Sequence, residues 1–396
     1  MSDITPAIIF SIIAGDVLGT PLDGMSRGHI KSCFGQLSGY PDPEPALKGK
    51  MDRWKKPGLY SSISQFMLLL GMSCLRKGSC TDAFFRSMTD SPALAENGYD
   101  IFRYPDGIES GFIARCKDRV GGPVQSAYPS TRILAALAPL AFRRIAPAEI
   151  LADATGFLRL FTADPKTLAA GLLHVFLLKS LAEDGQGGPD PVRAAVACAA
   201  ALEEMIASDC SAQVFASGAN PGVLAAEVRV LAEILALVAG ADSPGAAEDL
   251  ICSHLNRTIP NRITRATVNM PSALLPYAVA FTSFYRDDGR ILYRAAAEGG
   301  SSAPFASIVG SLAASFSGAA AAPEELLQGL VNRKRISTTA DNLAAGAPGP
   351  DLAEEFIRAE ASLTRKADEE LRARTRHLKK KPEKKSPSRA DREQAL

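Results

Sequence analysis

Two carboxylates near the amino terminus are candidates for acid–base chemistry. Asp16 and Asp23 lie at the end of an apolar stretch, and Gly19 between them permits a close backbone approach. A carboxylate in a cleft can act as the general base on a glycosidic bond. A Gly-Asp-x-x-Gly pattern is also typical of a helix end, so the alternative is that Asp16 caps a helix and Asp23 lies on the surface.

Two later segments predict helix starts that could bind phosphate. Each places glycine and serine before an apolar, helix-forming run, in Pro57-Gly-Leu-Tyr-Ser-Ser-Ile-Ser-Gln-Phe66 and in Glu298-Gly-Gly-Ser-Ser-Ala-Pro-Phe305. Backbone N–H groups at the first turn of a helix can hold an anion, although ordinary capping explains the same residues. The candidate ligand contacts are Ser61, Ser62, Ser64, Gly299, Gly300, Ser301 and Ser302.

A glycine-containing loop at 121–132 supplies two further candidates for ligand binding. Arg132 could pair with a phosphate through its planar guanidinium, and Tyr128 could stack on a base. For both residues the favoured alternative is an ordinary position in solvent, with Arg132 at a helix start. The four histidines are dispersed along the chain and predict no metal triad.

The elements that must position these residues are helices. Apolar residues recur at helical spacing over 131–145, 147–161, 165–182, 191–207 and 225–239, whereas strand signals are scarce. The sequence therefore predicts an all-α fold, with a compact multi-helix domain at 1–335. A linker and a charged surface helix should follow at 336–380, and a disordered basic tail at 381–396.

Composition limits the classes of function. The 396 residues are 46% hydrophobic and carry a formal net charge of +1, so nucleic-acid binding is not indicated beyond a weak contact by the basic tail. Seven scattered cysteines without ligand spacing predict reduced thiols and a cytoplasmic location. The apolar stretch at 6–15 is too short to span a membrane and predicts a buried first helix.

Taken together, the three glycine-punctuated segments resemble those of the ADP-ribosylglycohydrolase family. Members carry an N-terminal Gly-Asp-x-x-Gly-x-x-x-Glu element, a Thr-Asp-Asp-Thr element that opens an early helix, and a late Gly-Gly-Asp-x-Asp-Thr element. The order and approximate spacing match those of Gly15 to Asp23, Ser61 to Ser64 and Gly299 to Pro304. The resemblance implies an all-helical hydrolase fold, and Asp23 stands where some members use a Glu near the scissile bond.

The resemblance fails at the metal ligands. Family aspartates of the second and third elements bind two divalent cations that hold ADP-ribose. Here Ser61-Ser-Ile-Ser64 and Ser301-Ser-Ala-Pro304 replace them, so all four carboxylates are missing. Neutral hydroxyls are poor sole ligands for Mg²⁺, so we expect no family-type Mg or Mn pair and no metal cofactor.

Three hypotheses follow from the sequence. The first is a degenerate member without metal-dependent hydrolase activity, whose cleft binds ADP-ribose, a related nucleotide or an ADP-ribosylated protein. The second is an active hydrolase of an ADP-ribosyl or related glycosidic bond, with a rebuilt or metal-independent site that uses Asp16 or Asp23 as its base. The third is a scaffold for a protein partner, and the convergence of the two helix starts in space discriminates among them.

Overall fold

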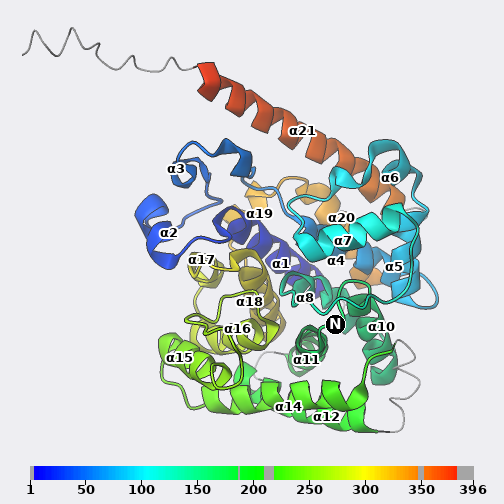
Figure 1. The fold of residues 1–396 in the computed structure, drawn as a ribbon, viewed down its shortest axis with the longest axis vertical. Coiled ribbons are helices and arrows are strands. Elements are labelled where there is room, and N and C mark those ends of the chain that lie inside the picture. The colour runs from blue at the N-terminus through cyan, green and yellow to red at the C-terminus, as the bar shows by residue number, and fades with distance from the viewer. Residues whose placement is uncertain (1–3, 186–187, 209–217, 347–351, 381–396) are drawn as a thin grey trace, which may run out of the picture.

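The structure, a computed structural model, describes residues 4–185, 188–208, 218–346 and 352–380, and these residues form a helical body (Figure 1). Within these ranges no β-strand occurs, and the one isolated β-bridge joins Ser26 to Gly299. The predicted all-α fold class is therefore confirmed.

The first helix, α1 (Thr5–Gly19), lies in the centre of the body and packs along α18 (Ser302–Ser317). Glycines make this packing close: a Cβ atom at Gly19 would lie 2.4 Å from the backbone of Ala303. The helical stretch Thr5–Leu22 is long and apolar enough to cross a membrane, but 83% of it is buried inside the protein. The core helix that the sequence predicts at 6–15 is therefore present as α1, which begins one residue earlier and ends four residues later.

The first half of the chain wraps around this pair in short elements. They are η1 (Thr20–Leu22), α2 (Arg27–Phe34), α3 (Glu44–Leu47), η2 (Met51–Arg53), α4 (Ser62–Cys74), α5 (Cys80–Thr89), α6 (Pro92–Asn97), η3 (Tyr99–Ile101), α7 (Gly107–Lys117), α8 (Arg132–Ala136) and α9 (Ala138–Ala141). The single helix predicted at 131–145 is wrong, because α8 and α9 divide it and α9 ends at Ala141. Pro139 lacks the N–H that a continuous helix needs and interrupts the run.

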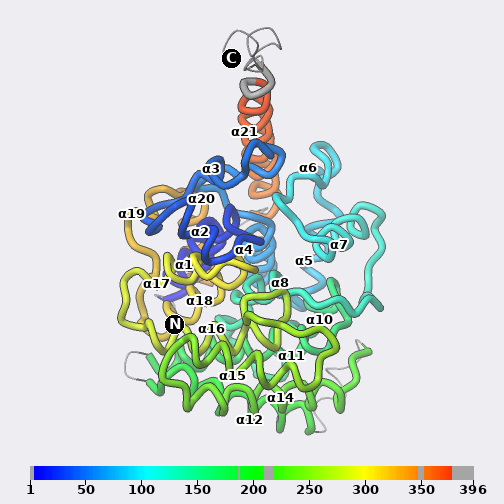
Figure 2. The backbone as a smooth tube through the Cα atoms, turned by 60° about the vertical axis from the view of Figure 1, so that its left-hand side comes forward, coloured from blue at the N-terminus to red at the C-terminus, as the bar shows by residue number. Residues whose placement is uncertain are grey.

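Mostly longer helices follow, and α12 and α14 lie side by side at the end of the body remote from α21 (Leu352–Lys380), whereas the short α17 lies beside α2 (Figure 2). These elements are α10 (Pro147–Arg159), α11 (Pro165–Asp184), α12 (Pro191–Ala207), α14 (Pro221–Val238), α15 (Pro244–Leu255), α16 (Pro271–Tyr285) and α17 (Ile291–Ala297). Proline opens six of the seven, as expected where a missing N–H costs nothing. The helix predicted at 225–239 begins earlier, at Pro221, because the Asn220 side chain caps it.

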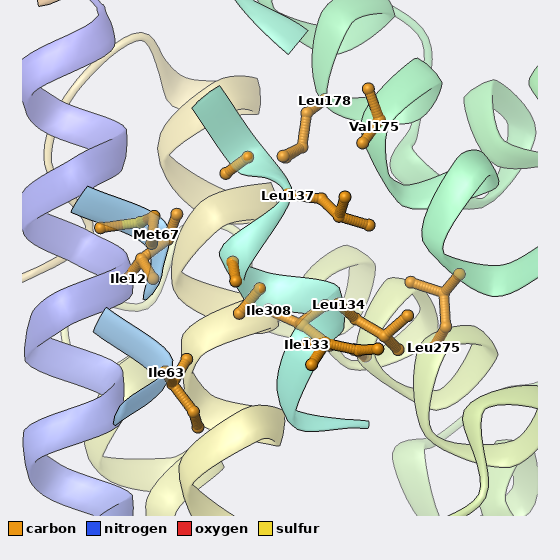
Figure 3. Close-up of a cluster of buried hydrophobic side chains, with 14 of the residues drawn as sticks. Ile12, Ile63, Met67, Ile133, Leu134, Leu137, Val175, Leu178, Leu275 and Ile308 are labelled. Atoms are coloured by element: carbon orange, nitrogen blue, oxygen red, sulfur yellow. The ribbon is translucent and has the colours of Figure 1, made fainter. Parts of the chain in front are cut away.

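One hydrophobic core joins the two ends. Figure 3 shows Ile12 of α1, Ile63 of α4, Ile133 of α8 and Ile308 of α18 directed into the same cluster. All four side chains are at most 1% exposed. The starts of α4, α8 and α18 are thereby held at fixed positions relative to α1.

The carboxy-terminal helices are more deeply integrated than the sequence predicts. They are α19 (Glu324–Gly329), α20 (Arg333–Ala345) and α21 (Leu352–Lys380). Phe356 and Ile357 of α21 are buried, and the fully buried Glu360 makes an ion pair with Arg103. The first half of α21 is therefore a core helix rather than the predicted surface helix.

The outer half of α21 projects from the body (Figures 1 and 2). Packing runs across the predicted domain boundary at residue 335, because Ile336 and Ala340 of α20 are buried in the main core. The basic tail predicted at 381–396 lies outside the described residues.

Candidate functional site

Asp16 of α1 caps the start of α4. The buried carboxylate accepts hydrogen bonds from Ser61 N at 2.9 Å, from Ser61 Oγ at 2.6 Å and from Ser64 Oγ at 2.6 Å. Thr20 Oγ1 donates a further bond at 2.9 Å. Asp16 is 0% exposed, so it serves as a tertiary cap of α4 and has no direct route to a substrate.

The start of α18 is capped by Asp23. Its Oδ1 accepts a hydrogen bond from Ala303 N at 2.8 Å, while Ser301 N donates to the Thr267 carbonyl at 2.8 Å. The Ser302 hydroxyl is buried and donates to the Ala296 carbonyl. The side chain of Asp23 is 22% exposed, so this cap, unlike Asp16, remains accessible to a ligand.

Two consecutive glycines just before α18 form a turn that contacts the loop after Asp23. Gly299 and Gly300 have φ values of +70° and +64°, and Gly24 N donates to the Gly300 carbonyl at 2.8 Å. A Cβ atom at Gly300 would lie 2.1 Å from the Thr267 carbonyl oxygen. Both positions therefore require glycine, and the turn is rigidly placed.

Arg132, the first residue of α8, occupies the space between these two helix starts. Its Nε donates to Glu109 Oε2 at 2.9 Å, and its Nη2 lies 3.2 Å from Ser61 Oγ and 3.0 Å from Ser62 Oγ. Its Nη1 lies 3.5 Å from Asp23 Oδ2. The guanidinium thus contacts the start of α4 directly, and it reaches the start of α18 only through Asp23, which caps that helix.

Glu109 is the buried counter-ion of Arg132. It belongs to a capping box at the start of α7 with Asp106, and Ser62 Oγ donates to its Oε2 at 2.8 Å. Burial raises the pKa of the Glu109 carboxyl, whereas Arg132 acts to lower it. Burial disfavours the charge of Arg132, but Glu109 and Asp23 keep its pKa above the usual value.

Asp23 lies between two cations. Burial raises the pKa of its carboxyl, and the charges of Lys55 and Arg132 act in the opposite direction. Lys55 Nζ donates to the Thr20 carbonyl at 2.7 Å, and burial lowers the pKa of its ammonium. A carboxylate with a raised pKa and partial exposure is the kind of group that can transfer a proton.

A groove of about 420 Å³ opens beside these residues. Of the predicted site residues, Asp23, Arg132, Gly300 and Ser301 line it. Thr267, which the sequence did not single out, also lines it, and its buried Oγ1 has no hydrogen-bond partner among the described residues. Thr267 is 0% exposed, as is Asp16, but it lines the groove, and its hydroxyl would reach a ligand oxygen only after a rotation of the side chain.

A second cavity of about 630 Å³ adjoins the groove. Tyr128, which is 71% exposed, lines this cavity, and Asp106 and Asn269 line both spaces. The volumes match those of sites for small molecules, and together they could hold an elongated ligand.

Other predicted contacts lie behind the groove wall. The hydroxyls bond within the protein, and the glycines serve close packing or the turn. These residues are Asp16, Gly19, Ser61, Ser62, Ser64, Gly299 and Ser302.

Sequence reasoning missed Glu109, Thr267 and Asn269 as parts of the site. Glu109 had a local signal, because Asp106-Gly-Ile-Glu109 is a capping-box pattern at a helix start. That signal predicts a helix terminus and gives no indication of a buried pair with Arg132. Thr267 and Asn269 lie in an irregular segment without any comparable pattern.

Few carboxylates lie at the groove: Asp23 and Asp106 line it, and Glu109 lies behind Arg132. Among the described residues, no group of three or more His, Cys, Asp or Glu side chains is close enough to hold a metal ion. Ser61 and Ser62, the serines for which the sequence predicts the loss of metal-binding carboxylates, face the guanidinium of Arg132. A hard cation needs carboxylate oxygens, and Glu109 and Asp23 are already paired with this fixed charge.

The helical body, with a groove between the starts of α8 and α18, defines an all-α hydrolase-type fold. The family model of ADP-ribosylglycohydrolase matches residues 7–353, and the chain therefore belongs to the ADP-ribosylglycohydrolase family. A solved structure described as an "ADP-ribosylglycohydrolase-related protein complex" is similar with a TM-score of 0.53. It shares 17% identity and the match covers 87% of this chain and 98% of that chain, which supports the fold. No curated protein matches the sequence.

Proposed function

We propose that this protein binds an ADP-ribosyl group or a related nucleotide in the groove without a divalent metal, and that it lacks the metal-dependent hydrolase activity of its family. The observation that carries the proposal is the position of Arg132. Its guanidinium contacts Ser61, Ser62, Glu109 and Asp23, so a fixed positive charge is supplied by the chain itself.

The groove offers suitable groups for such a ligand. Arg132 Nη1 makes a long 3.5 Å ion pair with Asp23, and a phosphate oxygen would share or displace this contact. Thr267 provides a hydroxyl for a ribose or phosphate oxygen. The Asn269 amide bonds Thr131 and the Pro129 carbonyl and retains one N–H for the ligand. Tyr128 in the adjoining cavity provides an exposed ring on which a base could stack.

Calorimetry of the full chain with ADP-ribose tests the proposal. We expect the same dissociation constant in EDTA and in Mg²⁺ or Mn²⁺, and a loss of affinity in Thr267→Val, which keeps the shape but removes the hydroxyl. Binding that requires metal, together with release of ADP-ribose from a modified protein, would contradict it. Absence of binding to ADP-ribose and ADP under all these conditions would favour a scaffold role.

A second candidate is hydrolysis without metals, with Asp23 as the general base. Its support is that Asp23 is partly exposed, lines the groove and has a raised pKa. Asp16, the other predicted base, is enclosed by five donors. Unchanged turnover in Asp23→Asn would remove Asp23 from the reaction, whereas a loss of turnover with intact ADP-ribose binding would support it.

An ADP-ribosylated protein in the cytoplasm is the partner that fits this proposal. The six described cysteines are free thiols, which is typical of a reducing compartment, and the predicted thiol Cys210 lies outside the described residues. Pull-down with an ADP-ribosylated peptide and with the unmodified peptide would test the choice of partner.

A further inference from the structure

A separate cavity of about 530 Å³ lies between α2 and α17, behind the Gly299–Gly300 turn. Ile30, Leu37 and the ring of Tyr293 supply its apolar walls, and Arg27, Lys31 and Arg290 add positive charge. It shares no lining residue with the groove or with the cavity of Tyr128. An apolar space with a few polar groups is typical of a small-molecule site.

The charge at this cavity is only partly neutralised. Lys31 is exposed, and neither Lys31 nor Arg290 has a carboxylate within ion-pair distance among the described residues. Arg290 instead lies over the Tyr293 ring, 5.1 Å from its centroid, and donates to the Leu37 carbonyl. The stacking fixes the guanidinium at the rim, so little conformational freedom is lost when an anion binds.

The remaining charges near the cavity are paired. Arg27 contacts Glu248 and Glu298, and Arg294 contacts Asp288. No acidic side chain lines the cavity itself. A ligand would therefore encounter a positive rim and an apolar floor.

We propose that this cavity binds a small organic anion, in which a phosphate or carboxylate contacts Lys31 and Arg290 and an apolar body packs on Ile30, Leu37 and Tyr293. This site is distinct from the groove of the proposed function. The two are nevertheless neighbours, because Ser26 at the start of α2 bridges Gly299, and a Cβ atom at Gly299 would lie 3.1 Å from Ile30 Cδ1.

Calorimetry with phenyl phosphate, which combines a charged group and an apolar ring, tests the proposal on the full chain. We expect saturable binding, and at least roughly tenfold weaker binding of inorganic phosphate, which lacks the ring. The variant Lys31→Ala/Arg290→Ala should weaken phenyl phosphate binding by about tenfold to a hundredfold, since it removes two charge-assisted contacts. Ala297→Phe, which fills the cavity, should abolish it.

The matched control is Arg76→Ala/Lys77→Ala, which removes the same two residue types from an exposed position elsewhere. Lys31→Ala alone tests the site with a variant that should fold normally, because this exposed side chain makes no ion pair in the described part of the chain. Equal affinity in the Lys31 variants and the control would refute the site, as would no binding up to about 10 mM. Displacement by ADP-ribose together with a loss in Thr267→Val would place the ligand in the groove and also refute it.

Discussion

Removing the guanidinium of Arg132 should expose how the site is held together. Arg132→Met keeps an unbranched side chain but leaves Glu109 fully buried without its counter-ion. Ser62 Oγ and Asp106 N still donate to Glu109, so the carboxylate loses its charge partner and keeps two hydrogen bonds. Breaking a buried ion pair from one side costs about 3–5 kcal/mol, and we expect a loss of that size in the free energy of unfolding.

A double-mutant cycle separates the pair from its surroundings. Glu109→Gln should destabilise the fold less than Arg132→Met, because Asp23 still lies 3.5 Å from the guanidinium. The double variant leaves neither member of the pair charged, so it should lose about 1–2 kcal/mol, well below the sum of the two single losses. Urea unfolding followed by circular dichroism, with an unchanged slope across the four proteins, gives these values.

The pH dependence supplies an independent check on the same pair. Burial raises the pKa of Glu109 above its unfolded value, so protonation favours the folded state, and stability is lost as pH rises through this range. Without Arg132 this pKa should rise further, and the loss in Arg132→Met should be larger at pH 8 than at pH 5. Additive losses in the cycle, or a loss independent of pH, would show that the buried charge is not what Arg132 stabilises.

Three further predictions concern stability. Burial lowers the pKa of the enclosed His174 to about 4, below its value in the unfolded chain. The free energy of unfolding should therefore decrease by about 3 kcal/mol as pH falls from 6.5 to 4. His174→Asn should flatten this part of the stability–pH curve. Glu360→Gln leaves Arg103 buried without its counter-ion and should cost about 3–5 kcal/mol in urea unfolding; an exposed-pair variant, Glu203→Gln, should cost under about 1 kcal/mol. Gly300→Ala places a Cβ against the Thr267 carbonyl and should lower the free energy of unfolding by more than about 2 kcal/mol. The control Gly245→Ala places its Cβ in open space in α15 and should leave the melting temperature unchanged or raise it.

Local sequence signals predicted where the helices start, but they did not predict which distant residues cap or contact those helices. Prolines at 147, 165 and 191 mark helix starts because the first turn tolerates a missing N–H, and all three open helices as predicted. Whether the segment from Gly15 to Asp23 converges with the two later segments was left open by the sequence. Local pattern cannot predict this convergence, because Asp16 caps α4 through Ser61, 45 residues later, and Asp23 caps α18 through Ala303, 280 residues later.

The buried charges were the hardest feature to predict. Nothing in the sequence near Glu109 or Glu360 distinguishes these residues from solvent-exposed helix residues, and the helical pattern of 352–380 is strongly charged. Their burial depends on long-range partners, Arg132 and Arg103, which compensate the cost of removing a carboxylate from water. Such pairing is a property of the tertiary structure, so sequence periodicity alone assigns these residues to the surface.

The geometry also predicts that restoring one family carboxylate would not restore a metal site. Ser62 Oγ lies 2.8 Å from Glu109 Oε2, so Ser62→Asp would place two carboxylates in contact inside the protein. Two like charges in one buried site force one of them to take up a proton, and we expect Ser62→Asp to be destabilised with no thermal shift in Mg²⁺. Ser62→Asp/Glu109→Gln removes the repulsion and should recover most of the stability. It should still not bind Mg²⁺, because the positive guanidinium of Arg132 lies 3.0 Å from the side chain at position 62. A rise in the melting temperature of Ser62→Asp in Mg²⁺ would show that the ion displaces the Arg132 guanidinium. The proposal that Arg132 takes the place of the metal would then be wrong.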